Sequence, residues 1–191
     1  AREAAVSASR VSSRLDVERI RADFPILQRQ INGRPIAYLD SANSAQKPRQ
    51  MIDAMSTFYA TSYANVHRAV YQLGVEATEA FEGTRSKVRA LLNAPSEREI
   101  IFTRDTTEAI NLVAYSYGRT NLGPGDVIVT TEIEHHSNLV PWQRVAQETG
   151  ATIRLVPLTD HATIDLNAYR QMLSSRTKVV ALASASNVLG T

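Results

Sequence analysis

Residues 127–156 read VIVTTEIEHHSNLVPWQRVAQETGATIRLV. Two short apolar runs, Val127–Thr131 and Ile153–Pro157, flank a segment with helical spacing over Leu139–Glu148. A strand, a helix and a second strand at this spacing predict a βαβ unit, in which the two strands are parallel. Continuous apolar strands are typical of a sheet that is covered on both faces.

The same alternation extends to both sides of this unit. Short apolar runs predict further strands over Ile100–Thr103 and Val179–Ala183. Helical spacing predicts helices over Thr107–Tyr117 and Leu166–Leu173. Residues 96–191 are therefore expected to form the first part of an α/β domain, with a mainly parallel sheet and helices on both faces.

The first half of the chain is expected to be mostly helical. Asp16 is a suitable N-cap for a short helix that runs through Ala22. Further predicted elements are a strand at Ile36–Leu39 and helices over Pro48–Tyr63 and Val75–Leu92. Residues 16–95 are therefore expected to form an N-terminal helical segment.

The two ends of the sequence lead to expectations of their own. Residues 1–15 are small and polar, with several serines and arginines, which predicts a disordered tail in preference to a transit peptide. The chain starts with Ala1 rather than methionine, and it stops at Thr191 directly after a predicted strand. We therefore expect a piece of a longer protein.

The composition excludes several classes of protein. Of the 191 residues, 43% are hydrophobic and 21% are charged, which argues against global disorder and against a coiled coil. No apolar run approaches the roughly 18 residues of a membrane-spanning helix. The 21 basic and 19 acidic residues are too balanced to indicate a nucleic-acid partner. The absence of cysteine excludes disulfides, thiolate metal sites and cysteine nucleophiles within these residues.

Polar clusters next to the predicted strands are the candidate binding residues, because open α/β sheets bind ligands at the carboxyl ends of their strands. Thr106 and Thr107 lie at a predicted helix N-terminus, where backbone N–H groups and hydroxyls can bind a phosphate. Simple capping by Thr106 is the alternative. The carboxylate of Asp105 would repel a phosphate unless it points away.

Two further clusters follow later strands. His135, in the EHHSN sequence of residues 134–138, can stack on an aromatic ligand or move protons near neutral pH, or it can be an ordinary loop residue. No familiar ligand spacing supports zinc there. Asn187 offers a donor and an acceptor, although asparagine is also common in turns.

A fourth cluster, His67 and Arg68, lies between the two long predicted helices. An arginine can bind a carboxylate through two hydrogen bonds, and the adjacent histidine adds a donor. An ordinary pair of surface charges is the alternative.

Taken together, these residues resemble the group II cysteine desulfurases, the SufS type. The matching strings are Tyr38–Ala42, Ser44–Pro48, Asn65–Arg68, Thr106–Val113, Glu134–Asn138, Val140–Trp142 and Ser186–Thr191. The resemblance covers nearly everything from Asp16 onward, and several strings in the same order are more specific than any one of them.

The resemblance implies a class V aminotransferase-like, fold-type I enzyme that uses pyridoxal 5′-phosphate (PLP) and forms a homodimer, of whose large domain this chain holds a part. It implies that Thr106 and Thr107 hold the cofactor phosphate. It also implies that His135 is a catalytic residue stacked on the pyridine ring, and that Asn187 contacts the ring on its phenolic oxygen side.

The resemblance also implies the reaction. His67 and Arg68 match a segment on the substrate side of the site. PLP acts as an electron sink while L-cysteine becomes L-alanine, and a nucleophilic cysteine takes the sulfur as a persulfide. The sulfur then passes to an acceptor protein of the SufE or SufU type for iron–sulfur cluster assembly. The resemblance implies a cytoplasmic enzyme without a metal ion.

This sequence departs from the family pattern. Lys47, Lys87 and Lys178 do not lie in the context of the family's Schiff-base lysine, and the nucleophilic cysteine is absent. Asp105 replaces the usual glycine or asparagine. We therefore expect these residues alone to be inactive. Two alternatives stay open: a selenocysteine lyase, kynureninase or epimerase of the same superfamily, and a non-catalytic binding or dimerisation fragment.

Overall fold

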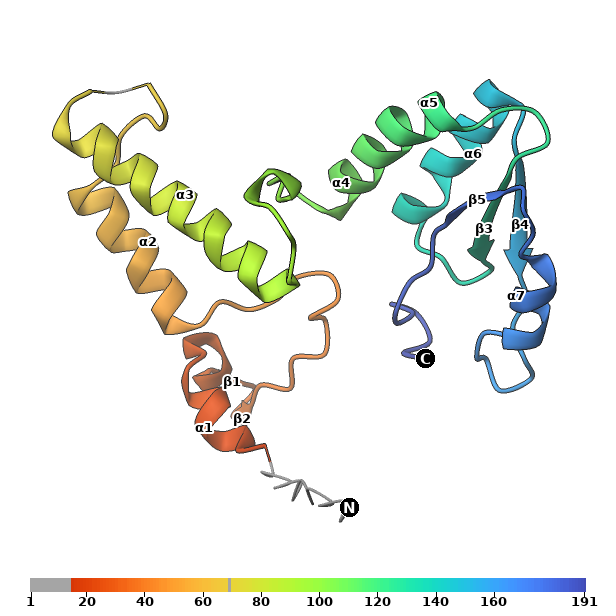
Figure 1. The fold of residues 1–191 in the computed structure, drawn as a ribbon. Helices are drawn as coiled ribbons and strands as arrows, with labels where there is room; N and C mark the ends of the chain where they lie inside the picture. Colours follow the sequence, from red (N-terminus) through yellow and green to blue (C-terminus); the bar gives the residue numbers. More distant parts are fainter. Residues whose placement is uncertain (1–14, 69) are drawn as a thin grey trace, which may run out of the picture. The chain divides into compact units, whose positions relative to one another are not determined.

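Figure 1 shows the computed structural model, which describes residues 15–68 and 70–191. Except for Leu15, the predicted N-terminal tail lies outside the described residues. The chain forms two compact units, Ala1–Glu99 (unit 1) and Ile100–Thr191 (unit 2). In the described part of the chain, no helix is long and apolar enough to cross a membrane.

The sheet of unit 2 confirms the predicted parallel arrangement. Its three strands lie in the order β4-β3-β5, with β3 over Val127–Thr131, β4 over Thr152–Val156 and β5 over Thr177–Val180. Both neighbours run parallel to β3. The carboxyl ends of all three strands therefore meet at one edge, as the βαβ pattern of residues 127–156 predicts.

Helices cover both faces of this sheet. The helical segments of unit 2 are α4 (Thr106–Val113), a π-helical turn (Ala114–Gly118), α5 (Arg119–Asn121), a 3₁₀ turn (His136–Asn138), α6 (Val140–Thr149) and α7 (Leu166–Met172). Figure 1 shows α6 and α7 on different sides of the strands. The predicted helix over Thr107–Tyr117 continues through the π-helical turn into α5.

Alternate residues of β3 face two different apolar clusters, because successive side chains of a strand point to opposite faces. Ile128 packs with Trp142 and Val145 of α6. Val129 packs with Val156 and with Tyr169 of α7. The two clusters together form the core of unit 2, and they explain why a strand made entirely of apolar and threonine residues lies at the centre of the sheet.

Some strand predictions in unit 2 were wrong. Ile100–Thr103 is not a strand, and both Ile101 and Phe102 are exposed. The predicted strand over Val179–Ala183 is shifted, because β5 pairs with β3 from Thr177 onward and ends at Val180. Burial on both faces holds only for the central strand β3. β4 and β5 are edge strands with several exposed residues.

Unit 1 begins with the predicted capped helix. The side chain of Asp16 accepts the N–H of Arg19 at 3.0 Å, and α1 covers Val17–Ala22. The 3₁₀ segments Pro25–Gln28 and Glu97–Glu99 lie near the two ends of the described part of this unit.

A short hairpin replaces the strand that was predicted at Ile36–Leu39. Strands β1 (Gln30–Ile31) and β2 (Arg34–Pro35) pair antiparallel. The turn between them has φ of 53° at Asn32 and 73° at Gly33. Two consecutive positive φ angles define the tight turn that an Asn-Gly pair favours. The chain therefore pairs before Ile36, and the apolar residues after it form no strand.

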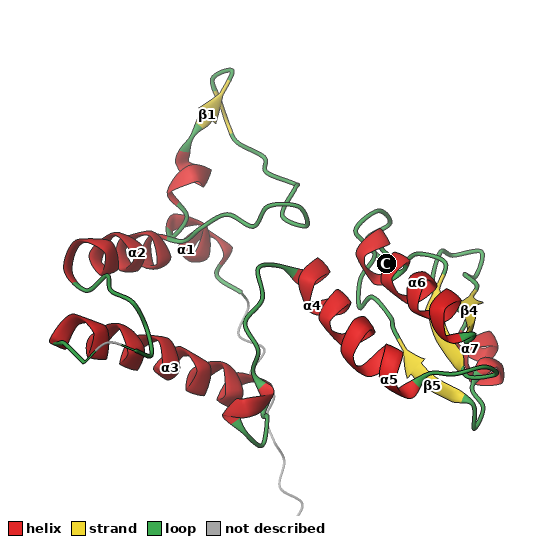
Figure 2. Ribbon diagram, turned by 90° about the horizontal axis from the view of Figure 1, so that it is seen from above, coloured by secondary structure: helices red, strands yellow, loops and turns green. Residues whose placement is uncertain are grey.

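Two long helices, α2 (Arg49–Thr61) and α3 (Gln72–Leu92), confirm the predicted helices of unit 1. Figures 1 and 2 both show them running alongside each other. Most residues of α2 are exposed, including Met55 and Tyr59, whereas Ala77 of α3 is buried.

Candidate functional site

A hollow of about 530 Å³ lies at the carboxyl edge of the sheet in unit 2. It is lined by Thr106 and one face of α4, by the loop that carries His135, by Trp142 of α6, and by residues 180–183 at the end of β5. Most of this lining is apolar. Thr106 and His135 are 29 positions apart in the sequence, and the fold brings them to the same hollow.

A second hollow of about 490 Å³ also has His135 in its lining. It is lined by residues 132–136 and by residues 186–189, which include Asn187. Glu134 and His135 line both hollows. The structure thus places Thr106 and His135 in one hollow, and His135 and Asn187 in the other. Thr107 is exposed beside Thr106, and it is not part of either lining.

The start of α4 is capped by Asp105, so the alternative of a Thr106 cap was wrong. The side chain of Asp105 accepts the N–H of Glu108 at 2.8 Å, and the side chain of Glu108 accepts the N–H of Arg104 at 2.7 Å. This exchange resembles a capping box. Among the described residues, the N–H groups of Thr106 and Thr107 have no acceptor. Two backbone donors at this helix end are therefore left for a ligand.

The imidazole of His135 is held through one of its two nitrogens. Its Nδ1 lies 2.8 Å from the hydroxyl oxygen of Ser137 and accepts the N–H of Ser137 at 3.2 Å. Because a backbone N–H can only donate, this contact assigns Nδ1 as the acceptor and Nε2 as the protonated nitrogen of the neutral ring. The side chain is exposed, which leaves the ring available to a ligand.

One residue of this edge was missed as a site residue by the sequence analysis. Glu134 accepts hydrogen bonds from Thr131, Asn138 and the backbone of Ala183. The first two partners lie within four positions of Glu134, and they could have been suspected from the polar EHHSN string. The third is a backbone N–H that only the packing of β5 beside β3 brings near.

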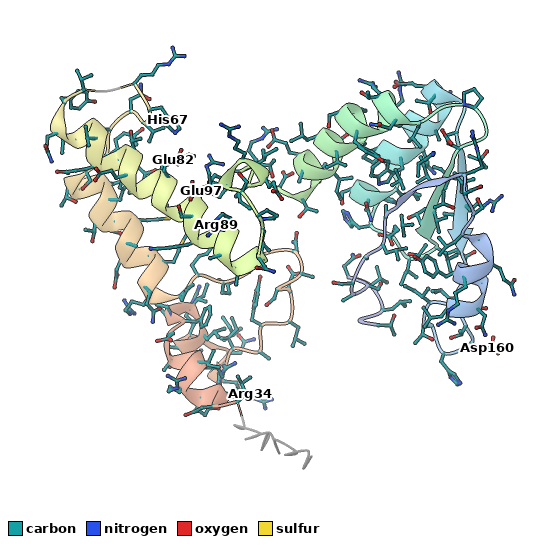
Figure 3. The ribbon with its side chains drawn as sticks, in the orientation of Figure 1. Arg34, His67, Glu82, Arg89, Glu97 and Asp160 are labelled. Carbon is teal, nitrogen blue, oxygen red and sulfur yellow. The ribbon has the colours of Figure 1, made fainter. Side chains whose placement is uncertain are left out.

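The remaining candidates, His67 and Arg68, belong to unit 1. Nε2 of His67 lies 2.7 Å from Oε1 of Glu82, and Figure 3 shows the two residues next to each other. The N–H of His67 donates to the hydroxyl of Thr78 at 2.9 Å, which holds a backbone with φ of 71°. The hydrogen bond from His67, aided by Arg85, lowers the pKa of Glu82 although burial opposes the shift. Arg68 is exposed.

No group of three or more histidine, aspartate or glutamate side chains is arranged to hold a metal ion in residues 15–68 and 70–191. The rings of His135 and His136 have their centroids 6.1 Å apart and tilted by 40°. Nδ1 of His135 is already bonded to Ser137.

The family model of the class-V aminotransferases matches residues 37–191. The chain belongs to this family. That span contains every candidate residue described above. The three-stranded parallel sheet with helices on both faces is the matching part of a PLP-dependent transferase fold.

This class-V aminotransferase chain is similar to cysteine desulfurases. It is 53% identical over 175 residues to the cysteine desulfurase of Dickeya dadantii (strain 3937), which covers 92% of this chain and 42% of that protein. The structure of the cysteine desulfurase CsdA from Escherichia coli, in its S-sulfonic acid form, matches with a TM-score of 0.75 and 42% identity. That match covers 91% of this chain and 42% of the other.

The apo structure of the cysteine desulfurase from Thermococcus onnurineus NA1 matches with a TM-score of 0.80 and 34% identity, covering 90% of this chain and 40% of that one. The class-V aminotransferase chain thus spans about two fifths of the length of these relatives.

Proposed function

We propose that the whole protein is a PLP-dependent cysteine desulfurase, and that these residues contribute the phosphate side and one ring face of its cofactor site. The observation that carries this proposal is the hollow that Thr106 and His135 line together at the carboxyl edge of the sheet. The reaction is supported by relatives of about half-identical sequence that are named cysteine desulfurases.

The donors at the start of α4 fit the phosphate end of PLP. The N–H groups of Thr106 and Thr107 have no acceptor among the described residues, and both hydroxyls are close by. The positive end of the helix dipole adds to their attraction for an anion. The carboxylate of Asp105, which accepts the third N–H of the helix, opposes this attraction.

The rest of the hollow fits a flat aromatic ring. Ile110 and Val113 of α4 form an apolar wall, and the exposed imidazole of His135 stands where a ring can stack on it. Asn187, in the second hollow, can donate to an oxygen on the ring edge. PLP, when bound, supplies an electron sink for bonds to the α-carbon of an amino acid.

His135 orients the ring and holds a proton at Nε2, the nitrogen that its contact with Ser137 leaves protonated. His67 and Arg68 match the family's substrate-side segment, and we assign them to the substrate side of the whole protein's site. The 191 residues contain no cysteine, so the group that takes the sulfur as a persulfide belongs to another part of the whole protein.

The finer assignments follow the resemblance of residues 134–138 and 186–191 to the group II enzymes. We assign the whole protein to the SufS type, acting as a cytoplasmic homodimer. It passes sulfur from L-cysteine to an acceptor of the SufE or SufU type for iron–sulfur cluster assembly.

The whole protein, loaded with PLP, should convert L-cysteine to equal amounts of alanine and sulfide in the presence of a reductant. His135→Ala should lower kcat/KM at least about 100-fold, because general acid–base groups typically contribute that much. The matched control is His161→Ala, which removes an exposed histidine from a loop of the same unit.

Two results would contradict the proposal. A PLP-loaded protein that forms neither product is not a desulfurase. A larger kcat/KM for L-selenocysteine or L-kynurenine than for L-cysteine would assign the reaction to one of the related enzymes instead.

A further inference from the structure

We infer that Glu134 is a positioning residue that fixes the imidazole of His135 between the two hollows. It does so through a chain of hydrogen bonds that we call the Glu134 clamp, formed by Thr131, Glu134, Asn138, Trp142 and Ala183. The importance of His135 rests on the proposed function, whereas the clamp rests on the hydrogen bonds themselves.

The carboxylate of Glu134 joins three separate pieces of the fold. Its Oε1 accepts the hydroxyl of Thr131, the last residue of β3, at 2.7 Å. The same oxygen accepts the N–H of Ala183, in the segment after β5, at 2.8 Å. Its Oε2 accepts Nδ2 of Asn138, at the end of the 3₁₀ turn that follows His135, at 2.8 Å.

The direction of every hydrogen bond in the clamp is fixed. Nε1 of Trp142 donates to Oδ1 of Asn138 at 3.2 Å, and an indole N–H can only donate. Oδ1 of Asn138 therefore faces the indole, and its Nδ2 must face Glu134. The backbone N–H of Ala183 is also a donor only. Both oxygens of Glu134 must consequently accept, which a carboxylate can do and an amide cannot.

The residues of the clamp lie on both sides of His135 in the sequence. Thr131 and Asn138 bracket the loop, and Glu134, which is bonded to both, directly precedes His135. Thr131 is 1% exposed, so this anchor is part of the core. Ala183 ties the same carboxylate to the segment that leads to Asn187. The backbone around His135 is thereby held to β3 and to the segment after β5, and His135 lines both hollows.

The test replaces the acceptor by an isosteric donor. Glu134→Gln places an NH₂ group against one of the donors, so we expect the loop to shift. The ring proton resonances of His135, assigned through His135→Ala, should move and broaden, while those of His161 stay unchanged. The matched control Glu79→Gln, an exposed glutamate on α3, should leave both unchanged.

Trp142 gives a second readout because it is the only tryptophan and is 4% exposed. In Glu134→Gln, loss of the hydrogen bond from Trp142 to Asn138 should shift the fluorescence emission of Trp142 to longer wavelength. Quenching of Trp142 fluorescence measures the binding of pyridoxamine 5′-phosphate, which has no aldehyde to react with lysines. Glu134→Gln should weaken that binding about tenfold, which corresponds to about 1.4 kcal/mol.

A conservative variant separates positioning from general stability. Thr131→Ser keeps the hydroxyl and should retain the wild-type spectra and affinity, whereas Thr131→Val should change them in the same direction as Glu134→Gln. Far-UV circular dichroism checks that each variant is folded.

The outcomes distinguish this inference from the proposed function. An unchanged His135 resonance in Glu134→Gln overturns the clamp, whatever the protein binds. A wild-type chain that does not bind pyridoxamine 5′-phosphate, together with a displaced His135 resonance in the variant, supports the clamp and contradicts the proposed cofactor site.

Discussion

The contact between Asp105 and the N–H of Glu108 determines which groups at the start of α4 can bind a ligand. Asparagine and aspartate are equally good N-caps, but only the aspartate places a negative charge at the helix end. Because Asp105 caps the helix, the hydroxyl of Thr106 is not needed for that purpose and stays in the lining of the hollow. One side chain thus leaves the phosphate donors in place and also lowers their attraction for an anion.

Substitutions of these two residues should change phosphate binding in opposite directions. Thr106→Val removes a donor to a charged group and should weaken pyridoxamine 5′-phosphate binding about tenfold. Asp105→Asn keeps the cap, removes the charge and should strengthen binding about threefold at low salt. Quenching of Trp142 measures both affinities, and pyridoxamine without phosphate should be insensitive to either change.

Thr57→Val is the matched control, because it alters an exposed threonine on α2 far along the chain from the hollow. Equal affinities of Thr106→Val and Thr57→Val would remove Thr106 from the site.

At the scale of elements, an ion-pair network couples α5 to α6. Glu148 of α6 accepts from Nε and a terminal nitrogen of Arg119 at 2.8 and 3.2 Å, and from Nε of Arg144 at 2.5 Å. Arg119 also stacks over the ring of Tyr115, with 4.2 Å from its guanidinium carbon to the ring centroid. Hydrogen bonds from Arg119 and then Arg144 lower the pKa of Glu148, against a smaller opposing effect of burial.

The lowered pKa of Glu148 predicts a pH-dependent contribution to the stability of unit 2. A carboxyl group whose pKa is lower in the folded state than its ordinary value of about 4.3 stabilises the fold above that value. This stabilisation is lost as the pH falls through the folded-state pKa. Glu148→Gln should therefore be less stable than the wild type near pH 7, and the two proteins should converge as the pH falls below the folded-state pKa of Glu148.

Urea unfolding followed by Trp142 fluorescence at several pH values measures this difference. Glu79→Gln, which changes an exposed glutamate on α3, should match the wild type throughout. A gap between the wild type and Glu148→Gln that widens on acidification would show that the ion pairs do not stabilise unit 2.

At the scale of the whole chain, apolar surface remains uncovered. Met51, Ile52, Met55 and Tyr59 form an exposed stripe at helical spacing on α2. The edge strands β4 and β5 also carry exposed apolar residues, such as Leu155 and Val180. Exposed apolar surface and open strand edges both favour association with other chains.

We therefore expect the 191-residue chain to self-associate. Sedimentation velocity at micromolar concentration should show species larger than a monomer. The double variant Ile52→Glu and Met55→Glu should shift the distribution toward the monomer, since it places charges in the exposed stripe. The control Gln50→Glu and Thr57→Glu adds the same charge on the polar side of α2. A monodisperse wild-type monomer would contradict this prediction.

The spacing of apolar and polar residues predicted the order and type of most elements. The spacing of apolar residues in 127–156 reports local burial, so it predicted β3, α6 and β4 and their parallel arrangement. The polar residues that follow these strands could be predicted to share one edge, because the carboxyl ends of parallel strands meet there. Strand predictions at Ile36–Leu39 and Ile100–Thr103 were wrong because an apolar run does not specify a pairing partner.

Which groups bond to one another at that edge depends on contacts that the sequence pattern does not specify. Asp105 rather than Thr106 caps α4, because capping depends on the exact backbone geometry at the start of the helix. Glu134 joins separate segments of the fold because β5 packs beside β3 and brings the N–H of Ala183, 49 positions away, within 2.8 Å of its carboxylate. Backbone N–H groups are the same at every residue, so no sequence pattern can specify such a partner; its position is set by long-range packing.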